Sequence, residues 1–251
     1  MADWLWIPKG VVPLRREPTH RSEMVSQILW GEPQQILQEE KGWVFVRGWV
    51  DGYVGWVPAG SLIAAWREGG GWAVVKRKWA PLFQVGKLVG YIPVGSLWPA
   101  SGIWRTAVGE FTTTASALLP WPSPALTVIP YQVYRLFRGA PYLWGGKTPA
   151  GVDCSGLTQI AYRLAGRLLS RDAYQQAEET FPIAAPSKGS LVFFTDSPAP
   201  SSRISHVGLY WGGGRLLHAT PANGVHITPY KLLFTHTFHS IRAQIEVDFV
   251  I

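Results

Sequence analysis

Cysteine is almost absent from this chain of 251 residues: Cys154 is the only one. A single thiol cannot form an internal disulfide or a cysteine-rich metal site, so Cys154 either packs as a small apolar residue or acts as a nucleophile. Ligand pairs with His-x-x-x-His or Cys-x-x-Cys spacing are also absent. Zinc held by Cys154 and two histidines is therefore a weak alternative, and no metal or other cofactor is expected.

Long apolar runs and concentrated charge are missing as well. No stretch approaches the roughly eighteen uninterrupted apolar residues of a transmembrane helix, so no membrane partner is expected. Only 16% of the residues are charged and 47% are hydrophobic, which favours packed cores over disorder. The net charge is +7, but the basic side chains are scattered apart from residues 76–78, and no nucleic-acid motif accompanies them. We therefore expect no nucleic-acid partner.

A secretion signal is not recognisable at the N-terminus. Asp3 is acidic, and no apolar segment of sufficient length follows it. A free thiol without disulfides suits a reducing compartment. These features predict a cytoplasmic protein, with export as the alternative if a leader has been removed, and we expect a monomer.

The residues around Cys154 favour a nucleophile. The stretch before it, residues 142–153, is rich in turn-forming residues, and apolar residues follow it with helical spacing at 157, 160, 161, 164 and 168. Asp153 can cap this helix, so the thiol lies in the first turn. There the helix dipole and the unpaired amides favour the thiolate.

A base and a third group for such a nucleophile occur downstream. Residues 205–219 predict a β-hairpin in which His206 and His218 lie twelve residues apart on either side of three glycines. The two imidazoles share a face only if the turn holds an odd number of residues or a bulge. His206 can then pair with Cys154 while His218 orients its ring. Either histidine alone is an ordinary strand residue, but together with Cys154 they indicate catalysis.

The N-terminal half contains short, glycine-punctuated strands anchored by tryptophan. The chain holds 27 Gly, 20 Pro and 14 Trp, a composition typical of small β-barrels with tight turns. Residues 52–63 are echoed by residues 86–98, because in both an apolar Gly-aromatic-aliphatic-Pro strand ends in Gly-Ser-Leu. The repeat predicts two barrels of about sixty residues each. The Pro-rich run at 119–125 predicts a linker to a third domain.

The cysteine and histidine motifs resemble those of a known family. Asp-Cys-Ser-Gly-Leu, then Ser-His-Val-Gly, then a further histidine resemble the NlpC-type cell-wall peptidases, a papain-like branch of cysteine peptidases. The resemblance implies that Cys154 is the nucleophile, His206 the base and His218 the orienting residue. It also implies that Tyr142, in the Tyr-x-Trp-Gly-Gly run, helps to bind the oxyanion. The family's Gly-Asp-Leu-Val-Phe-Phe strand entry has Ser190 here in place of the aspartate, which affects a local turn contact.

The two repeats look like bacterial SH3-like domains. The predicted fold is therefore multi-domain: two small SH3-like β-barrels followed by an α+β papain-like NlpC-type peptidase domain. The expected boundaries are residues 1–64 for the first barrel, 65–125 for the second barrel with the Pro-rich linker, and 126–251 for the peptidase domain.

Two barrels before such a domain resemble a narrower group, the γ-D-glutamyl-L-diamino-acid endopeptidases, which act on murein peptides with a free N-terminal L-Ala. Residues 16–32 resemble the first-barrel signature of that group. By position, Glu17 and Tyr53 reach the cleft from the barrel, and Asp172 pairs with the alanine ammonium. The implied partner is a murein-derived peptide, L-Ala-γ-D-Glu-diamino acid, with either meso-diaminopimelate or L-lysine as the diamino acid.

The same resemblance implies further substrate contacts beside the catalytic residues. Asp153 and Ser155 flank the nucleophile and help to bind the D-glutamyl portion, and Ser205, next to His206, also faces the substrate. Some relatives have serine after the ammonium-binding aspartate, whereas Ala173 offers no hydroxyl.

Simpler roles and other functions stand beside this hypothesis. Asp172 and Gln175 form a good capping box, Glu17 is a solvated loop charge, and Tyr53 is a barrel-surface aromatic. The remaining histidines are expected to be structural or surface residues: His20, His226, His236 and His239. The alternative functions are a general cell-wall hydrolase, a wall-binding module with an inactive peptidase domain, and a papain-like acyltransferase.

Overall fold

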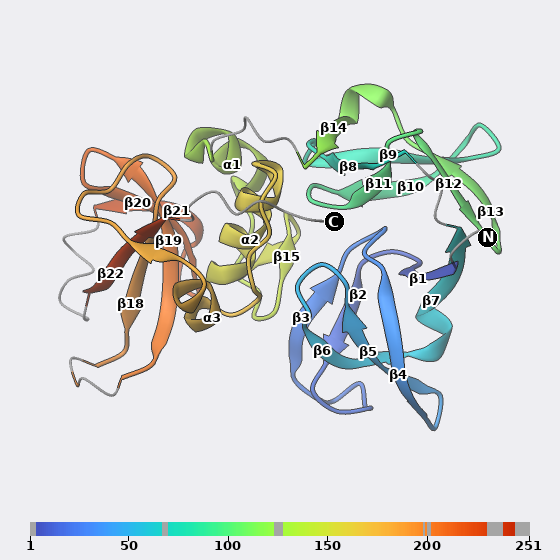
Figure 1. The fold of residues 1–251 in the computed structure, drawn as a ribbon, viewed down its shortest axis with the longest axis horizontal. Coiled ribbons are helices and arrows are strands. Elements are labelled where there is room, and N and C mark those ends of the chain that lie inside the picture. Colours follow the sequence, from blue (N-terminus) through green and yellow to red (C-terminus); the bar gives the residue numbers. More distant parts are fainter. Residues whose placement is uncertain are drawn as a thin grey trace.

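The computed structural model contains two β-barrels and a third domain, which holds the α-helices of the residues that the structure describes (Figure 1). The structure describes residues 4–66, 70–122, 128–197, 199, 202–229 and 238–243. The helical domain lies on the left of Figure 1, the first barrel at the lower right and the second barrel at the upper right. The predicted fold class, two SH3-like barrels before an α+β papain-like domain, is confirmed.

The first barrel closes around alternating apolar side chains. Its core contains Leu14, Val44, Val46 and Val57, which point inward from three strands. The elements are β1 (Trp4–Pro8), β2 (Val12–Arg15), β3 (Met24–Ile28), β4 (Gln34–Glu40), β5 (Trp43–Gly48), β6 (Val54–Pro58), a 3₁₀ turn (Ala59–Ser61) and β7 (Leu62–Trp66).

The second barrel packs around tryptophan and shares its core with the first. Trp98 and Trp104 are fully buried, and Trp30 and Ile7 of the first barrel belong to the same apolar cluster. The elements are β8 (Trp72–Val75), β9 (Trp79–Gln84), β10 (Lys87–Pro93), β11 (Leu97–Pro99), β12 (Ile103–Thr106), β13 (Gly109–Thr112), a 3₁₀ turn (Ala115–Ala117) and β14 (Leu118–Trp121). Sharing this core fixes the two barrels against each other.

Strands run through the expected start of the second barrel and into the expected linker. The expected boundary between residues 64 and 65 falls inside β7, where Ala65 pairs with Thr106 of β12 and joins strands of both barrels into one sheet. The run at 118–121 is β14, paired with β8. The part of the expected linker from 119 to 121 is therefore a strand, because its apolar residues complete the barrel.

The C-terminal domain has a small two-stranded sheet, β15–β16, and a six-stranded antiparallel sheet with helices on its barrel-facing side. The strand order is β17-β22-β18-β19-β20-β21, and α1 and α2 lie between this sheet and the barrels (Figure 1). The elements are α1 (Pro130–Phe137), β15 (Lys147–Thr148), β16 (Gly151–Val152), α2 (Cys154–Leu164), α3 (Ala173–Glu178), β17 (Phe181–Pro182), β18 (Leu191–Thr195), β19 (Ile204–Gly212), β20 (Arg215–Thr220), β21 (Gly224–Pro229) and β22 (Phe238–Ala243).

Apolar side chains of α2 fill the space above the sheet. Leu157 and Ile160 of α2 pack with Leu191, Phe193 and Leu209, all fully buried. Ser190, at the position where the family has aspartate, accepts a hydrogen bond from the backbone N–H of Ser187 at 3.1 Å, so serine makes the local turn contact. None of the described helices is long and apolar enough to cross a membrane.

A buried carboxylate joins all three parts of the molecule. Glu32, from the turn after β3, accepts hydrogen bonds from Lys147 Nζ at 3.2 Å and from Arg163 NH1 at 2.5 Å. Arg163, on α2, also donates to the carbonyl of Gly95 in the second barrel at 2.8 Å. The side chains of Glu32, Lys147 and Arg163 are at most 4% exposed. Glu32 therefore bridges two buried cations at the centre of the molecule, and Asp51 of the first barrel lies 3.8 Å from Lys147 as a second carboxylate.

Removing this carboxylate should destabilise the protein strongly. Glu32→Gln leaves the buried Arg163 without its ion-pair partner and leaves Lys147 with only Asp51, at 3.8 Å, which costs about 3–5 kcal/mol. We expect the urea midpoint and the melting temperature to fall accordingly. Glu110→Gln is the matched control, because Glu110 pairs with Arg105 on the surface, where such pairs contribute about 1 kcal/mol or less. Equal midpoints for the wild type and Glu32→Gln would contradict this role of the Glu32 carboxylate.

Candidate active site

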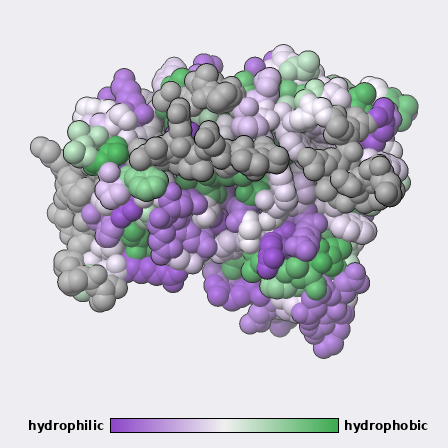
Figure 2. Space-filling view, in the orientation of Figure 1, coloured by the Kyte–Doolittle hydropathy of each residue, from purple (hydrophilic) through white to green (hydrophobic). Residues whose placement is uncertain are grey.

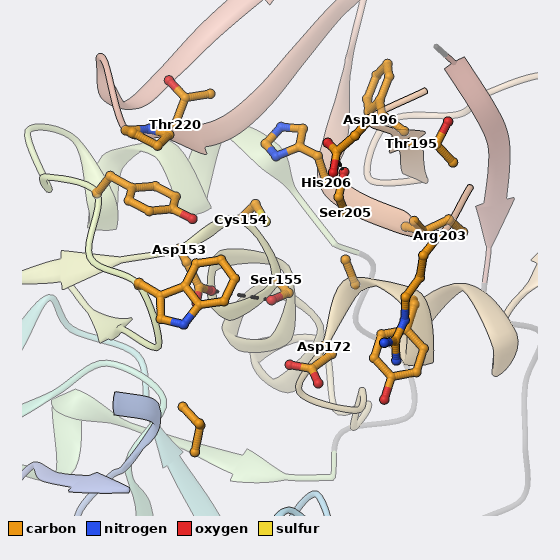
Figure 3. A pocket seen from close by; sticks show the side chains of 18 of the residues that line it. Asp153, Cys154, Ser155, Asp172, Thr195, Asp196, Arg203, Ser205, His206 and Thr220 are labelled. Carbon is orange, nitrogen blue, oxygen red and sulfur yellow. Dashed lines mark hydrogen bonds between the residues drawn. The ribbon is translucent and has the colours of Figure 1, made fainter. Parts of the chain in front are cut away.

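A cleft of about 840 Å³ lies between the first barrel and the C-terminal domain. The surface is notched between these two parts (Figure 2), and the side chains that line the cleft converge from α2, α3 and β19 (Figure 3). Cys154, His206 and Tyr142 line it from the C-terminal domain, and Tyr53 lines it from the barrel. The cleft therefore brings together residues that are far apart in the sequence.

Cys154 begins α2, and the predicted N-cap at Asp153 is confirmed. The Asp153 carboxylate accepts hydrogen bonds from the backbone N–H groups of Gly156 at 2.7 Å and Gly145 at 2.8 Å. Arg171 adds two more at 3.1 and 2.6 Å and also donates to Ser155 Oγ at 2.8 Å. The carboxylate is thus occupied in holding the loop and the helix on either side of the thiol.

The thiol of Cys154 is buried, and this determines its protonation. Burial, reinforced by the Asp153 charge, raises the pKa of Cys154 to about 12, while the Val207 amide and the Arg171 charge lower it by less. Burial therefore opposes the expected effect of the helix terminus and favours the neutral thiol. Burial also lowers the pKa of His206 to about 4. Both groups are neutral at pH 7.

The predicted hairpin and its bulge are confirmed. Tyr210 pairs with Leu216 and Gly212 with Arg215, which leaves one extra residue in β19. Gly213 and Gly214 have φ values of 60° and 71°, as a two-residue turn of this handedness requires. The resulting register places His206 and His218 on the same face of the sheet.

The two histidines hydrogen-bond to each other directly. The His206 Nε2 to His218 Nδ1 distance is 2.8 Å, and His218 Nε2 lies 3.2 Å from Thr228 Oγ1. If Thr228 accepts from His218 Nε2–H, then His218 Nδ1 accepts from His206 Nε2–H, and His206 Nδ1 carries the free lone pair. That tautomer makes Nδ1 the atom of His206 available to accept a proton in the cleft.

Strand β21 supplies two residues that the sequence pattern did not connect with the site. His226 pairs with His218 across the strands, and their ring centroids lie 4.4 Å apart. Burial, with smaller contributions from His206 and His226, lowers the pKa of His218 to about 3. His226 is therefore a neighbour of the histidine pair. Residues 226 and 228 are two apart, so they share one face of a strand, and this was the available signal in the sequence. Only the register of β20 with β21 shows that this face is the one that carries His218.

Tyr142 is a hydroxyl donor on the cleft wall. It precedes the glycine turn that leads to β15, and it lines the same cavity as Cys154. Burial, with the nearby Cys154 and Asp153, raises the pKa of the Tyr142 hydroxyl. The hydroxyl therefore keeps its proton and can donate a hydrogen bond to a negatively charged oxygen.

The barrel and α3 meet at a carboxylate–tyrosine pair. The Tyr53 hydroxyl lies 3.1 and 3.3 Å from the two oxygens of Asp172. The Asp172 backbone N–H donates to Gln175 Oε1 at 3.0 Å, so the capping-box contact is present beside the cleft contact. Burial raises the pKa of Asp172 in spite of nearby Arg171. A cation placed against Asp172 would relieve the cost of desolvating this carboxylate.

Glu23, and not Glu17, lines the cleft from the first barrel. Glu17 is exposed and does not belong to the lining residues. Glu23 accepts hydrogen bonds from Trp144 Nε1 at 2.7 Å and from Arg16 Nε at 2.8 Å. Both glutamates lie in the loop between β2 and β3. The sequence gives no indication of which of the two side chains points into the cleft.

The other predicted contact residues differ in their burial and in their hydrogen-bond partners. Ser155 is buried beside Arg171, so its hydroxyl is already partnered. Ser205 lines the cleft and donates to Asp196 at 2.5 Å. His20 and His239 are exposed, as expected, and His236 lies outside the described residues. Among the described residues no group of three or more His, Cys, Asp or Glu side chains could hold a metal ion.

Comparison with known proteins identifies the domains. The profile of the NlpC/P60 family matches residues 139–242, and that of the bacterial dipeptidyl-peptidase SH3 domain matches residues 14–62. Residues 139–242 thus form a domain of the NlpC/P60 family, whose members are cell-wall cysteine peptidases, and residues 14–62 form a bacterial SH3 domain.

Individual relatives match this chain to different extents. Dipeptidyl-peptidase 6 of Lysinibacillus sphaericus is 28% identical over 242 residues, covering 82% of this chain and 84% of that protein. The γ-D-glutamyl-L-lysine dipeptidyl-peptidase of Bacillus subtilis (strain 168) is 40% identical over 90 residues, but these span only 35% of this chain and 30% of that protein. The solved structure of an NlpC/P60 family protein from Bacillus cereus ATCC 10987 has a TM-score of 0.79 at 18% identity, covering 97% of this chain and 100% of that one, and shows the same fold.

The neutral state of the thiol can be tested by alkylation, since Cys154 is the only reactive thiol. With a pKa near 12, its thiolate fraction should rise about tenfold per pH unit above neutrality. We expect iodoacetamide to modify the native protein more slowly than it modifies a free thiol at pH 7, with a rate that still rises at pH 10. Adduct formation is followed by intact mass, with urea-unfolded protein as the control. A rate that is already constant above pH 6 would show a preformed thiolate–imidazolium pair.

Proposed function

We propose that this protein is a cysteine endopeptidase that hydrolyses the γ-D-glutamyl–diamino acid bond of murein peptides with a free N-terminal L-Ala. The observation that carries the proposal is the Tyr53–Asp172 pair, which places a partly buried carboxylate in the cleft that contains Cys154. A dipeptide of L-Ala and D-Glu needs an ammonium site at one end and a nucleophile at the other. The names of two relatives, both γ-D-glutamyl-L-lysine dipeptidyl-peptidases, support this substrate class.

The cleft residues divide the reaction between them. His206 Nδ1 accepts the thiol proton as Cys154 Sγ attacks the γ-carbonyl of the D-glutamyl residue, and a carbon–sulfur bond forms. The Tyr142 hydroxyl and the backbone N–H groups in the first turn of α2 stabilise the oxyanion. The imidazolium then gives its proton to the leaving amine of the diamino acid as the carbon–nitrogen bond breaks. Water activated by His206 hydrolyses the thioester and releases L-Ala-D-Glu.

Because the resting pair is neutral, the base must be oriented accurately. The His218 ring fixes His206, and the Thr228 hydroxyl selects the tautomer that leaves Nδ1 free. His218 is only 1% exposed, so water cannot replace either contact easily. Charge then develops on His206 only during the reaction, next to a ring that accepts its Nε2–H.

The histidines and Thr228 should contribute unequally. Cys154→Ala and His206→Ala should abolish turnover of L-Ala-γ-D-Glu-L-Lys, as measured by release of free lysine. His218→Gln should retain part of the rate, because an orienting residue contributes less than the base. Thr228→Val should lower kcat more than Thr228→Ser, since only serine keeps the acceptor. Rates within a few-fold of wild type for both His206→Ala and His218→Gln would refute these roles.

Recognition of the free amine is the second test. N-acetylation removes the charge that Asp172 would pair with and adds bulk against the first barrel. The loss of a desolvated ion pair should lower kcat/KM by on the order of a hundredfold or more. Asp172→Asn should weaken cleavage of the free-amine tripeptide and shrink the preference, whereas His239→Ala, at an exposed site, should change neither.

The ratio of kcat/KM for free and N-acetylated tripeptide distinguishes the candidate functions. Equal rates on both peptides would indicate a general wall hydrolase. No cleavage of either peptide, with binding retained, would indicate a binding module. Transfer of the acyl group to an added amine in place of water would indicate an acyltransferase.

A further inference from the structure

Arg203 is the cation in the cleft that lacks an ionic partner. The lining residues include two arginines, Arg16 and Arg203. Arg16 is paired with Glu23 at 2.8 Å. Arg203 forms no ion pair with any residue that the structure describes. The buried Arg171, behind the cleft wall, is occupied by Asp153 and Ser155.

An aromatic ring holds the guanidinium of Arg203 in place. Arg203 directly precedes β19, and its Cζ lies 3.5 Å from the ring centroid of Tyr174, the second residue of α3. Stacking on a ring fixes the plane of a guanidinium and leaves the N–H groups along its edge free to donate. A planar fork of this kind matches the geometry of a carboxylate. The stacked Arg203 is therefore a ready carboxylate receptor.

Arg203 and Asp172 lie on the same side of Cys154. In Figure 3 the Arg203 side chain extends from β19 toward the start of α3, where Asp172 is located. The two residues form no ion pair with each other in the described structure, yet the charge of Arg203 lowers the pKa of Asp172 against the larger, opposite effect of burial. One anion and one cation without ionic partners thus stand close together on one wall of the cleft.

Such a pair is complementary to a ligand that carries both charges a short distance apart. In the substrate, the γ-carboxyl of D-Glu is joined to the diamino acid, so its α-carboxylate is free. The L-Ala ammonium and this α-carboxylate belong to adjacent residues and lie about 6 Å apart when the chain is extended. Ala173 lines the same wall and offers no side-chain donor. We propose that Arg203, stacked on Tyr174, binds the free α-carboxylate of the D-glutamyl residue, so that the enzyme selects the acid over its α-amide. This inference rests on the proposed function.

The consequence is discrimination between two forms of the substrate. Amidation of the α-carboxyl, which gives D-isoglutamine, removes the negative charge and replaces one acceptor oxygen with an NH₂ donor that faces the guanidinium. Asp172 alone would repel the carboxylate of the acid form, so Arg203 also offsets that repulsion. Specificity for the acid therefore depends on Arg203.

The experiment compares L-Ala-γ-D-Glu-L-Lys with L-Ala-γ-D-isoGln-L-Lys. Wild type should cleave the acid with a kcat/KM on the order of tenfold or more above that of the amide, because a charge-assisted contact is lost. Arg203→Gln should lower kcat/KM for the acid by on the order of tenfold to a hundredfold, mainly through KM, and change cleavage of the amide by a few-fold at most. Arg203→Lys, which keeps the charge without the fork, should be intermediate.

Controls distinguish a failure of the role of Arg203 from a failure of the proposed function. Arg215→Gln removes the same charge from an exposed position at the other end of the hairpin and should leave the acid-to-amide ratio unchanged. An acid-to-amide ratio near one in wild type, or an unchanged ratio in Arg203→Gln, overturns the role of Arg203 while the preference for a free amine still stands. Failure to cleave either tripeptide, or equal cleavage of the N-acetylated one, overturns the proposed function and this inference with it.

Discussion

The buried carboxylate of Glu32 is the constraint on which the arrangement of the domains depends. It neutralises Lys147, which follows the glycine turn before the nucleophile, and Arg163, on the helix that begins with the nucleophile. Both cations belong to the C-terminal domain, whereas the carboxylate belongs to the first barrel. The Ser26 hydroxyl accepts from Arg171 at 3.0 Å in the same interface, so the barrel also supports the arginine that holds Asp153. The barrel is thus part of the active site's foundation as well as one wall of its cleft.

Desolvation explains the protonation of this cleft and contributes to the specificity proposed for it. Burial keeps the thiol and the imidazole neutral, because each charged form would lose its hydration. The same low polarity makes unpaired charges in the cleft costly, and a substrate that supplies the missing partners gains from the pairing. Asp172 is partly buried and bears this cost, whereas Arg203 is exposed and contributes its charge without it; Arg16, Glu23 and Asp153 in the lining are already ion-paired. The protonation of the thiol and the imidazole and the cost at Asp172 therefore have one physical cause.

What could be predicted from the sequence is mostly local. The N-cap at Asp153 and the bulged hairpin that joins His206 to His218 depend on residues close together in the chain, and the structure confirms both. The Tyr53–Asp172 contact, 119 residues apart, was expected only through resemblance to a family. Glu23 was missed because the direction of a side chain in a loop depends on packing against the other domain. Thr228 was missed because the residues of β21 do not by themselves determine its register with β20. The raised pKa of the thiol was missed because burial depends on the whole fold.

The position of Glu32 in the chain also affects the order in which the charged groups become available during synthesis. Synthesis runs from the N-terminus, and domains generally fold as they emerge from the ribosome. Glu32 precedes Lys147 by 115 residues and Arg163 by 131. The barrel can therefore present its carboxylate before either cation has been made. The helix of the nucleophile closes onto a surface that already carries the opposite charge, and the two cations need never be buried together without it.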